Sequence, residues 1–154
     1  MPSMNAIDLL VEDHKKVRQM LNELSDTTNR AAKKREDLLN KIRKEVQIHT
    51  QIEEEIFYPA FRDSDGGEHK KLYFEAKEEH RAVDKLVLPD LESTEPTTEE
   101  FQGRVKVLKD MIEHHAEEEE KEMFPKAKKT LSSEQLRELG ERMATRKQEL
   151  QKQL

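Results

Sequence analysis

Apolar residues recur along most of this chain at alternating steps of three and four, which is the spacing of one face of an α-helix. Residues typical of turns divide the pattern into five predicted helices, over about residues 5–24, 30–58, 68–88, 97–124 and 133–152. No segment shows the alternation of apolar and polar residues that marks a strand. The sequence therefore predicts one all-α domain covering residues 1–154. Its architecture would be an up-down-up-down four-helix bundle over about residues 5–129, with an additional C-terminal helix.

Several helix ends are predicted from capping residues and prolines. Asn5 precedes the first apolar face and is the expected N-cap there. Thr97 and Ser132 each stand three residues before Glu or Gln, which is the spacing of a capping box. Pro59 is predicted to kink or end the second helix, and Pro89 to stop the third, because proline lacks the N–H that an interior helical position needs.

Histidine and glutamate interrupt the apolar faces of the four predicted bundle helices. In the first helix the face is formed by Ile7, Leu10, His14, Val17, Leu21 and Leu24. Across the four helices the interruptions are His14, His49, Glu53, His80, His115 and Glu119. Burying an unpaired carboxylate in an apolar core costs several kcal/mol. Polar residues at these core-facing positions therefore require a partner.

A shift of 66 residues (80 − 14 = 66) maps the first half of the chain onto the second. It takes each polar residue to one of the same kind: His14 to His80, His49 to His115, Glu53 to Glu119, and also Pro59 to Pro125. The repeat predicts two helical hairpins related by an approximate two-fold axis. Two equivalent half-sites would then meet in the bundle core.

The spacing of these residues suits metal binding. Histidine and glutamate four residues apart lie on one helical face, one turn from each other. Each such pair can present an imidazole nitrogen and a carboxylate to one point, and the other two helices add one histidine each. Six donors are too many for one tetrahedral ion but suit two ions bridged by carboxylates. Nitrogen and oxygen donors without sulfur suit iron or manganese, with zinc as a further candidate. Open positions would remain for water, an oxo or hydroxo bridge, or a substrate.

The remaining histidines and glutamates have simpler interpretations. His69 lies near a predicted helix start, and His114 lies one step off the apolar face, so neither is predicted to bind metal. Glu54, Glu55 and most of the run Glu117–Glu122 are predicted to lie on solvated helical faces.

The sequence leaves open the role of Asp84 and whether the six residues bind metal or only pair with one another. Asp84 follows His80 by four residues and would either bind the same ion or accept a hydrogen bond from that imidazole. The alternative for the whole set is a metal-free core in which buried His–Glu ion pairs fix the helix register. The duplication of all six donors in register favours metal.

Composition narrows the class of protein. The net charge is 28 − 34 = −6 with both signs interspersed, which argues against nucleic-acid binding. The absence of cysteine excludes disulfides, iron–sulfur clusters and thiol catalysis. No apolar run has the length of a membrane span, and residues 1–10 lack the regions of a signal peptide. We therefore expect a cytoplasmic protein without a membrane partner, and the sequence predicts no particular protein partner.

The segments that carry these residues resemble the hemerythrin-like family, also called the HHE cation-binding domain. The matching segments are residues 9–14 (Leu-Leu-Val-Glu-Asp-His), His49–Pro59, Glu79–His80 and His115–Pro125, and residues 131–136 are similar to the family's final helix. The resemblance implies a non-haem di-iron centre with two shared carboxylates and two histidines on each iron. The implied roles are Glu53 and Glu119 as bridges, His14 and His49 on one iron, and His80 and His115 on the other.

The chain departs from the oxygen-carrying hemerythrins at one position. Those proteins have a fifth histidine four residues after the one that matches His80, and here that residue is Asp84. The four-histidine branch is associated with peroxide and nitric oxide chemistry and with oxygen or iron sensing. The resemblance thus implies a di-iron protein that binds or turns over O₂, peroxide or NO, with catalase-like or NO-detoxifying activity.

Three other possibilities remain open from the sequence. The first is a non-enzymatic module that senses or stores iron or a diatomic gas, and the second is a metal-free helical interaction domain. The third is a ferritin-like carboxylate bundle, which would pair Glu-x-x-His with extra glutamates. Here the order is His-x-x-x-Glu and the histidines outnumber the glutamates.

Overall fold

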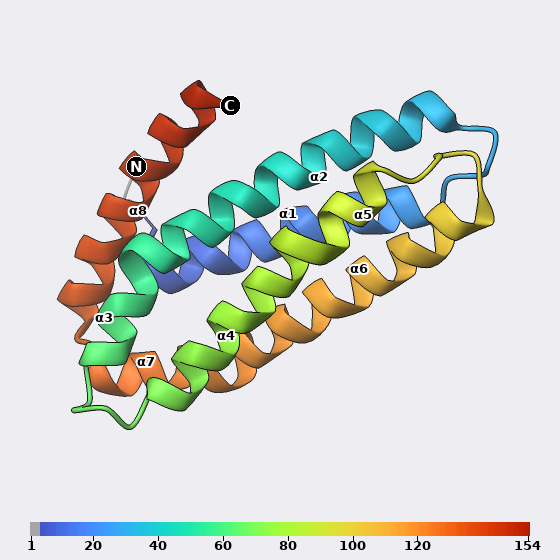
Figure 1. Cartoon of the computed structure of the whole chain (residues 1–154). Coiled ribbons are helices and arrows are strands. Elements are labelled where there is room, and N and C mark those ends of the chain that lie inside the picture. The colour runs from blue at the N-terminus through green and yellow to red at the C-terminus, as the bar shows by residue number, and fades with distance from the viewer. Residues whose placement is uncertain (1–3) are drawn as a thin grey trace.

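The computed structural model describes residues 4–154, and every regular element within that range is helical (Figure 1). Four helices run antiparallel, each to the next, and form the bundle: α1 (Ala6–Ser25), α2 (Ala32–Ile52), α4 (Lys70–Ala82) and α6 (Glu99–Glu118). Three of these continue through a π-helical turn into a short α-helix: η1 (Glu53–Phe57) with α3 (Tyr58–Asp63), η2 (Val83–Val87) with α5 (Leu88–Glu92), and η3 (Glu119–Met123) with α7 (Phe124–Thr130). The last helix, α8 (Ser133–Gln153), lies at one end of the bundle. The prediction of a four-helix bundle with an additional C-terminal helix is confirmed.

The helix starts agree with the predicted caps at two of three positions. Asn5 and Ser132 are the N-caps of α1 and α8. The prediction at Thr97 is wrong by one residue. Thr98 is the N-cap of α6, and its hydroxyl accepts a hydrogen bond from the backbone N–H of Phe101 at 3.1 Å. An N-cap side chain bonds the backbone N–H three residues further on. Phe101 is buried in the core, and the residue three positions before it is Thr98, so Thr98 is the cap.

A π-helical turn precedes each of the three prolines inside the long helices. In η1 the backbone N–H of Tyr58 donates to the carbonyl of Glu53, five residues earlier, and η2 and η3 repeat this pattern. The wider turn gives room to a proline ring that would clash in a regular α-helix. The helices therefore continue through Pro59 and Pro89, where the sequence predicted a kink or an end.

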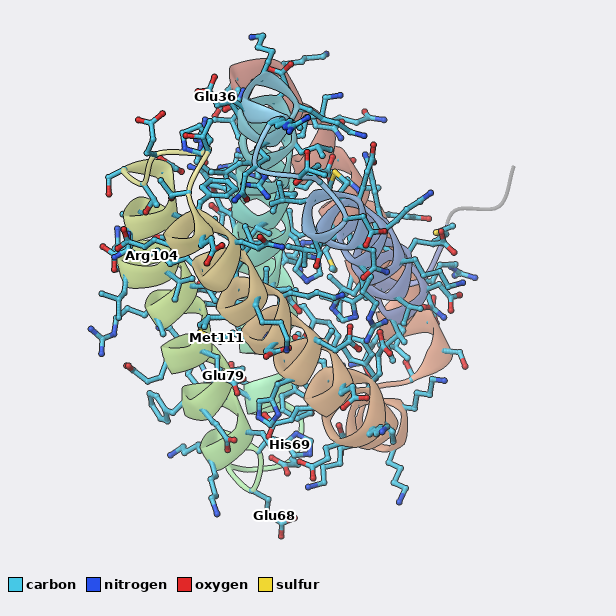
Figure 2. All side chains as sticks on the ribbon, turned by 90° about the vertical axis from the view of Figure 1, so that its right-hand side faces the viewer. Glu36, Glu68, His69, Glu79, Arg104 and Met111 are labelled. Carbon is cyan, nitrogen blue, oxygen red and sulfur yellow. The ribbon has the colours of Figure 1, made fainter. Side chains whose placement is uncertain are left out.

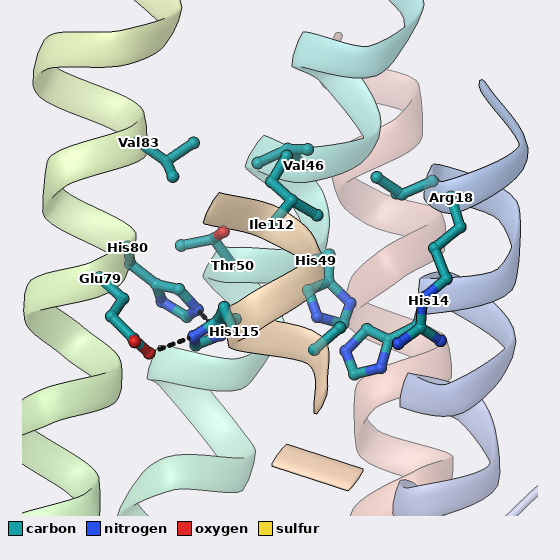
Figure 3. A pocket seen from close by; sticks show the side chains of 12 residues that line it. His14, Arg18, Val46, His49, Thr50, Glu79, His80, Val83, Ile112 and His115 are labelled. Atoms are coloured by element: carbon teal, nitrogen blue, oxygen red, sulfur yellow. Dashed lines mark hydrogen bonds and ion pairs between the residues drawn. The ribbon is translucent and has the colours of Figure 1, made fainter. Parts of the chain in front are cut away.

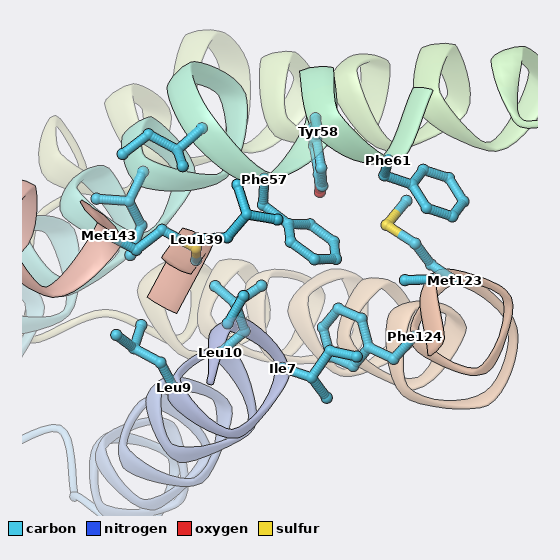
Figure 4. Close-up of a cluster of buried hydrophobic side chains, with 14 of the residues drawn as sticks. Ile7, Leu9, Leu10, Phe57, Tyr58, Phe61, Met123, Phe124, Leu139 and Met143 are labelled. Atoms are coloured by element: carbon cyan, nitrogen blue, oxygen red, sulfur yellow. The ribbon is translucent and has the colours of Figure 1, made fainter. Parts of the chain in front are cut away.

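Two clusters of buried apolar residues fill the bundle, one toward each end. The cluster near α8 includes Ile7, Leu10, Phe57, Phe61, Phe124 and Met143 (Figure 4). The cluster at the opposite end includes Leu21, Leu39, Ile42, Leu91, Phe101 and Leu108. Burying one such side chain contributes about 1.5–3 kcal/mol, so these clusters stabilise the helices that hold the polar residues between them.

Helix α8 closes the bundle by packing on α1, α2 and η1. The contact with α1 is close at Gly140, where a Cβ atom would lie 2.3 Å from the backbone oxygen of Met4. The ammonium group of Lys147 in α8 donates to Asp13 Oδ1 in α1 at 2.5 Å. Charged side chains cover the outside of the bundle (Figure 2). None of the helices within residues 4–154 is long and apolar enough to cross a membrane.

Candidate metal centre

The six predicted donors converge in the bundle core, between the two apolar clusters. They form two groups whose donor atoms lie within 4.8 Å of one another: His14, His49, Glu53 and Glu119 in one, and Glu53, His80 and His115 in the other. The first group takes its histidines from α1 and α2, and the second from α4 and α6. The two predicted half-sites are thus adjacent and share a carboxylate.

Each of the two central carboxylates approaches one histidine of each half-site. The distances from carboxylate Oε1 to imidazole Nε2 are 3.0 Å (Glu53–His49), 3.2 Å (Glu53–His80), 3.0 Å (Glu119–His14) and 3.5 Å (Glu119–His115). This is the arrangement that two ions with shared carboxylate ligands require.

Several of these donor atoms lack a hydrogen bond. Both side-chain oxygens of Glu53 and Nε2 of His49 are buried, and among the described residues no group meets them in hydrogen-bond geometry, although Glu53 Oε1 and His49 Nε2 are 3.0 Å apart. The ring nitrogens Nε2 of His80 and His115 lie 3.0 Å apart, so two potential donors to a metal face each other. Buried polar atoms without partners are costly. A cation bound among them would satisfy both the lone pairs and the carboxylate charge, so the residues present fit a metal ion.

A second set of carboxylates orients the four imidazole rings from outside. These outer carboxylates contact Nδ1 of each ring: Glu120 to His14 at 2.7 Å, Asp13 to His49 at 2.9 Å, Glu54 to His80 at 3.0 Å, and Glu79 to His115 at 2.7 Å. A carboxylate on Nδ1 fixes the proton there and leaves Nε2 free to bind a metal. The prediction that Glu54 is solvated is wrong, because it contacts His80. Glu120 is likewise an exception within the solvated run Glu117–Glu122.

The outer carboxylates extend the internal repeat. The shift of 66 residues takes Asp13 to Glu79 and Glu54 to Glu120 (13 + 66 = 79, 54 + 66 = 120). Both the central donors and the groups that orient them therefore follow the approximate two-fold axis.

Tyr58 is a member of this centre that the sequence pattern did not reveal. Its hydroxyl donates to Glu119 Oε2 at 2.7 Å and lies 3.1 Å and 3.3 Å from Nε2 of His80 and His115. Steps of three and four along the sequence lead from Glu53 to Ile56 and Ala60 and pass over Tyr58. The π-helical turn makes the step from Glu53 to Tyr58 five residues long and brings the tyrosine inward.

The repeat is broken at the tyrosine. Its counterpart is Phe124 (58 + 66 = 124). Both rings stack on a histidine: Tyr58 on His80, with centroids 5.3 Å apart, and Phe124 on His14, with centroids 6.0 Å apart. Only the second half-site therefore has a phenol oxygen beside its histidines.

Asp84 lies outside the centre. Its side chain is about half exposed, pairs with Lys85 at 3.4 Å, and lines a surface groove beside Glu54. The inward position on this turn belongs to Val83, which is buried and lines the cavity described below. We therefore leave Asp84 out of the proposed ligand set.

The two histidines predicted not to bind metal are not in either central group. His69 is buried at the α3–α4 connection, where it stacks on Phe61 with centroids 4.0 Å apart and contacts the Phe61 carbonyl (Figure 2). His114 is 64% exposed and lies near Glu79 and Glu118 at the surface. A structural role accounts for His69.

A small cavity of about 50 Å³ adjoins the imidazoles (Figure 3). All four central histidines line it, and its walls carry four branched apolar residues, from α1, α2, η2 and α6: Val17, Val46, Val83 and Ile112. The central carboxylates and Tyr58 are not among the residues that line it. The cavity therefore reaches the centre from the histidine side and has room for only a few heavy atoms.

The metal-free centre shifts the pKa values of its own donors. Burial acts to lower the pKa of His80, but contacts with Glu53 and Glu54 raise it to about 9. Burial also opposes charge on His49, yet the neighbouring Glu53 carboxylate raises the pKa of that imidazole well above its usual range. Burial acts to raise the pKa of Glu53, but the charge on His49 holds it well below normal. Without metal, protons on His49 and His80 offset the negative charge of Glu53.

These shifts predict how the stability of the metal-free protein depends on pH. His80 titrates near pH 6.5 when unfolded and near pH 9 when folded, so its contribution is complete below pH 6.5 and lost as pH rises through 9. We expect chelated protein to lose up to about 3 kcal/mol from this group between pH 6 and pH 9.5. Urea denaturation at both pH values would measure the loss. His114→Ala should show the same profile, and no loss in the native chain would contradict the assignment.

Comparisons with known proteins point to a cation-binding domain. Residues 5–127 match the profile of the Hemerythrin HHE cation binding domain. The chain is 30% identical over 152 residues to a DNA nickase from Nostoc sp., covering 98% of this chain but only 41% of the nickase. It is 28% identical to the protein Rv2633c of Mycobacterium tuberculosis, covering 96% of this chain and 88% of that protein. A crystal structure of the Rv2633c homolog from Mycobacterium kansasii, a Hemerythrin HHE cation binding domain-containing protein, matches with a TM-score of 0.83 and 29% identity. That match covers 96% of this chain and 87% of the other.

Proposed function

Since this chain belongs to the hemerythrin HHE cation-binding family, we propose that it is a non-haem di-iron protein whose centre binds or turns over O₂, peroxide or NO. One observation carries the proposal: four histidines and two shared carboxylates converge beside a cavity with room for only a few heavy atoms. Manganese or zinc would also suit the donors. Zinc does not change oxidation state, as turnover of these ligands requires, and iron is preferred to manganese because the resemblance to the hemerythrin-like family implies it.

The proposed ligands divide between two positions. The first, which we call the His14–His49 position, has those two histidines, and the His80–His115 position has the other two. Glu53 and Glu119 would bridge them, since each lies near one histidine of each position. Water, hydroxide or oxide would complete the bridge. Bound iron would supply electron transfer to or from the small ligand.

The chain's own residues control access and proton positions. The cavity is lined mainly by the imidazoles and by apolar side chains, with Arg18, Thr50 and Glu79 also at its wall, and its volume admits only small molecules. The outer carboxylates hold the proton of each imidazole on Nδ1. Tyr58 keeps its proton and donates it in a hydrogen bond to Glu119 Oε2, because burial and the charge of Glu119 raise the pKa of the phenol well above its usual range.

DNA cleavage is not part of the proposal. Nicking activity belongs to a relative of which this chain matches 41% of the length, and the net charge of −6 is unfavourable for binding a polyanion.

An assay of small-molecule turnover tests the proposed chemistry. We expect iron-loaded protein to disproportionate hydrogen peroxide to water and oxygen, or to reduce NO when an electron donor is supplied. Zinc-loaded protein should be inactive because zinc does not change oxidation state. Peroxide loss would be followed by evolved oxygen, and NO loss with an electrode. Iron-loaded protein that binds NO, as seen in its absorption spectrum, without consuming either compound would favour the sensing or storage alternative.

Tyr58→Phe should separate the role of the phenol oxygen from that of the ring. We expect the variant to fold, because Phe124 occupies the corresponding position in the other hairpin. We expect iron to bind about tenfold more weakly at both positions, because the shared ligand Glu119 loses the hydrogen bond that orients it. Anaerobic titration with Fe²⁺ would measure this change. Tyr73→Phe is the matched control, since that hydroxyl contacts Arg62 rather than the centre. An unchanged affinity in Tyr58→Phe would show that the hydroxyl does not hold Glu119.

A further inference from the structure

The internal repeat does not extend to the groups beyond the outer carboxylates. Within the described residues, both outer carboxylates of the His14–His49 position contact a cation. Arg18 pairs with two carboxylates: its Nη1 donates to Glu120 Oε2 at 3.0 Å and its Nε to Glu113 Oε2 at 2.9 Å. Lys147 Nζ donates to Asp13 Oδ1 at 2.5 Å. Both cations are about three-quarters buried, so solvent screens them only partly.

The first of these cations is replaced by an acid in the other half of the chain. The residue that corresponds to Arg18 is Asp84 (18 + 66 = 84), and it lines a groove beside Glu54. Three cations also line that groove, but each contacts another group: Arg81 with Glu78 at 2.7 Å, Lys85 with Asp84 at 3.4 Å, and Lys77 over the ring of Tyr73 at 5.4 Å. The closest polar contact of Glu54 is the imidazole of His80 at 3.0 Å.

The second cation has no counterpart either. Lys147 comes from α8, which packs on the side of α1 and α2. Glu79, which corresponds to Asp13, lies instead near His114 and near a second carboxylate, that of Glu118. The His80–His115 position is therefore surrounded by more uncompensated negative charge than its counterpart.

This difference affects how strongly each pair of imidazoles can hold a cation. A carboxylate on Nδ1 makes the opposite nitrogen a better donor. A cation on that carboxylate withdraws part of this effect and also repels a nearby metal ion through the poorly screened interior. Both cations lie beside the His14–His49 position, so both differences favour the His80–His115 position.

We propose that the two metal positions are inequivalent, with the His80–His115 position binding a divalent cation more tightly and filling first, and with Arg18 and Lys147 as the positioning residues that weaken the other. The proposal rests on the metal centre proposed above. It implies that the protein holds one ion firmly and exchanges the second more readily.

Calorimetric titration of chelated protein with Fe²⁺ under anaerobic conditions tests the order of filling. We expect two binding steps that differ by at least about tenfold in dissociation constant. His14→Ala should lose the weaker step and His80→Ala the tighter one. Two steps of equal affinity, or loss of the tighter step in His14→Ala, would overturn the proposal. Complete absence of Fe²⁺ binding would overturn the metal centre itself and this inference with it.

Charge variants test the assigned cause. Lys147→Met and Arg18→Met should each tighten the weaker step by about tenfold and leave the tighter step within about twofold. Asp84→Arg should weaken the tighter step, because it supplies the missing cation. Lys106→Met is the matched control: it removes one positive charge from an exposed pair with Asp110, and neither step should change. If both Met variants fold by circular dichroism and leave the weaker step unchanged, Arg18 and Lys147 do not set the difference.

Discussion

Glu53→Ala is expected to abolish metal binding at both positions, not only at one. Glu53 is fully buried, and its Oε1 lies near one histidine of each half-site. Removing it takes away a shared ligand and a negative charge from two adjacent cations. We expect the affinity for Fe²⁺ to fall by at least about 100-fold at each position, since loss of an orienting carboxylate alone costs 10–100-fold. Iron content after anaerobic loading and desalting would measure the loss.

The matched control for this prediction lies two residues along the same π-helical turn. Glu55→Ala removes a carboxylate that is partly exposed and contacts Arg146, so both ions should remain. Glu53→Gln, which keeps the side-chain volume, should lose iron as Glu53→Ala does if the charge is what matters. One retained ion per chain in Glu53→Ala would show that the carboxylate serves a single position.

The six central residues could be predicted because they break an otherwise apolar pattern. A histidine or glutamate on a core-facing position is conspicuous in sequence, and the duplication after 66 residues made coincidence implausible. The helices were equally predictable, because their apolar faces follow the regular spacing over many turns. Both features depend only on local periodicity.

The residues that the sequence did not reveal depend on departures from that periodicity or on contacts between helices. Tyr58 turns inward because a π-helical turn adds one residue to the step, and apolar spacing of three and four cannot register it. The proline that follows it is the available signal, since all three π-helical turns precede a proline. Asp84 was misplaced for a related reason. Asp84 follows His80 by four residues, but Val83 takes the inward position on this turn, so the Asp84 side chain lies at the surface.

The outer carboxylates were missed for a different reason. Glu54 and Glu120 stand beside the core face in acidic runs that are typical of a solvated surface. Only the packing of one helix on another brings them to the imidazoles of His80 and His14. The internal repeat was a usable signal, because it maps the four outer carboxylates onto one another as it does the ligands. A carboxylate adjacent to a core-facing glutamate in both halves is thus informative where either one alone is not.

Removal of metal from the native protein is expected to lower its melting temperature by about 10 °C or more. The six donors form a polar layer between the two apolar clusters. In the metal-free state both carboxylate oxygens of Glu53 and Nε2 of His49 are buried, and no group among the described residues meets them in hydrogen-bond geometry. Each ion at about 100 times its dissociation constant stabilises the fold by roughly 2.7 kcal/mol. Two ions then add about 5 kcal/mol, and a chain of this size melts about 2–4 °C higher for each kcal/mol.

The experiment must separate the effect of losing the metal from any effect of the chelator on the protein. Calorimetric melting at pH 7 would compare iron-loaded protein, chelated protein from which metal analysis shows the iron to be absent, and chelated protein reloaded with Fe²⁺. Glu53→Ala serves as the control chain, because a protein that cannot hold the ions should melt at the same temperature before and after chelation. The shift should also grow with free Fe²⁺ concentration, since ligand-linked stability depends on ligand activity. Equal melting temperatures for loaded and metal-free native protein would mean that the buried donors are satisfied by their own ion pairs, and the metal-free interpretation of the core would then replace the di-iron one.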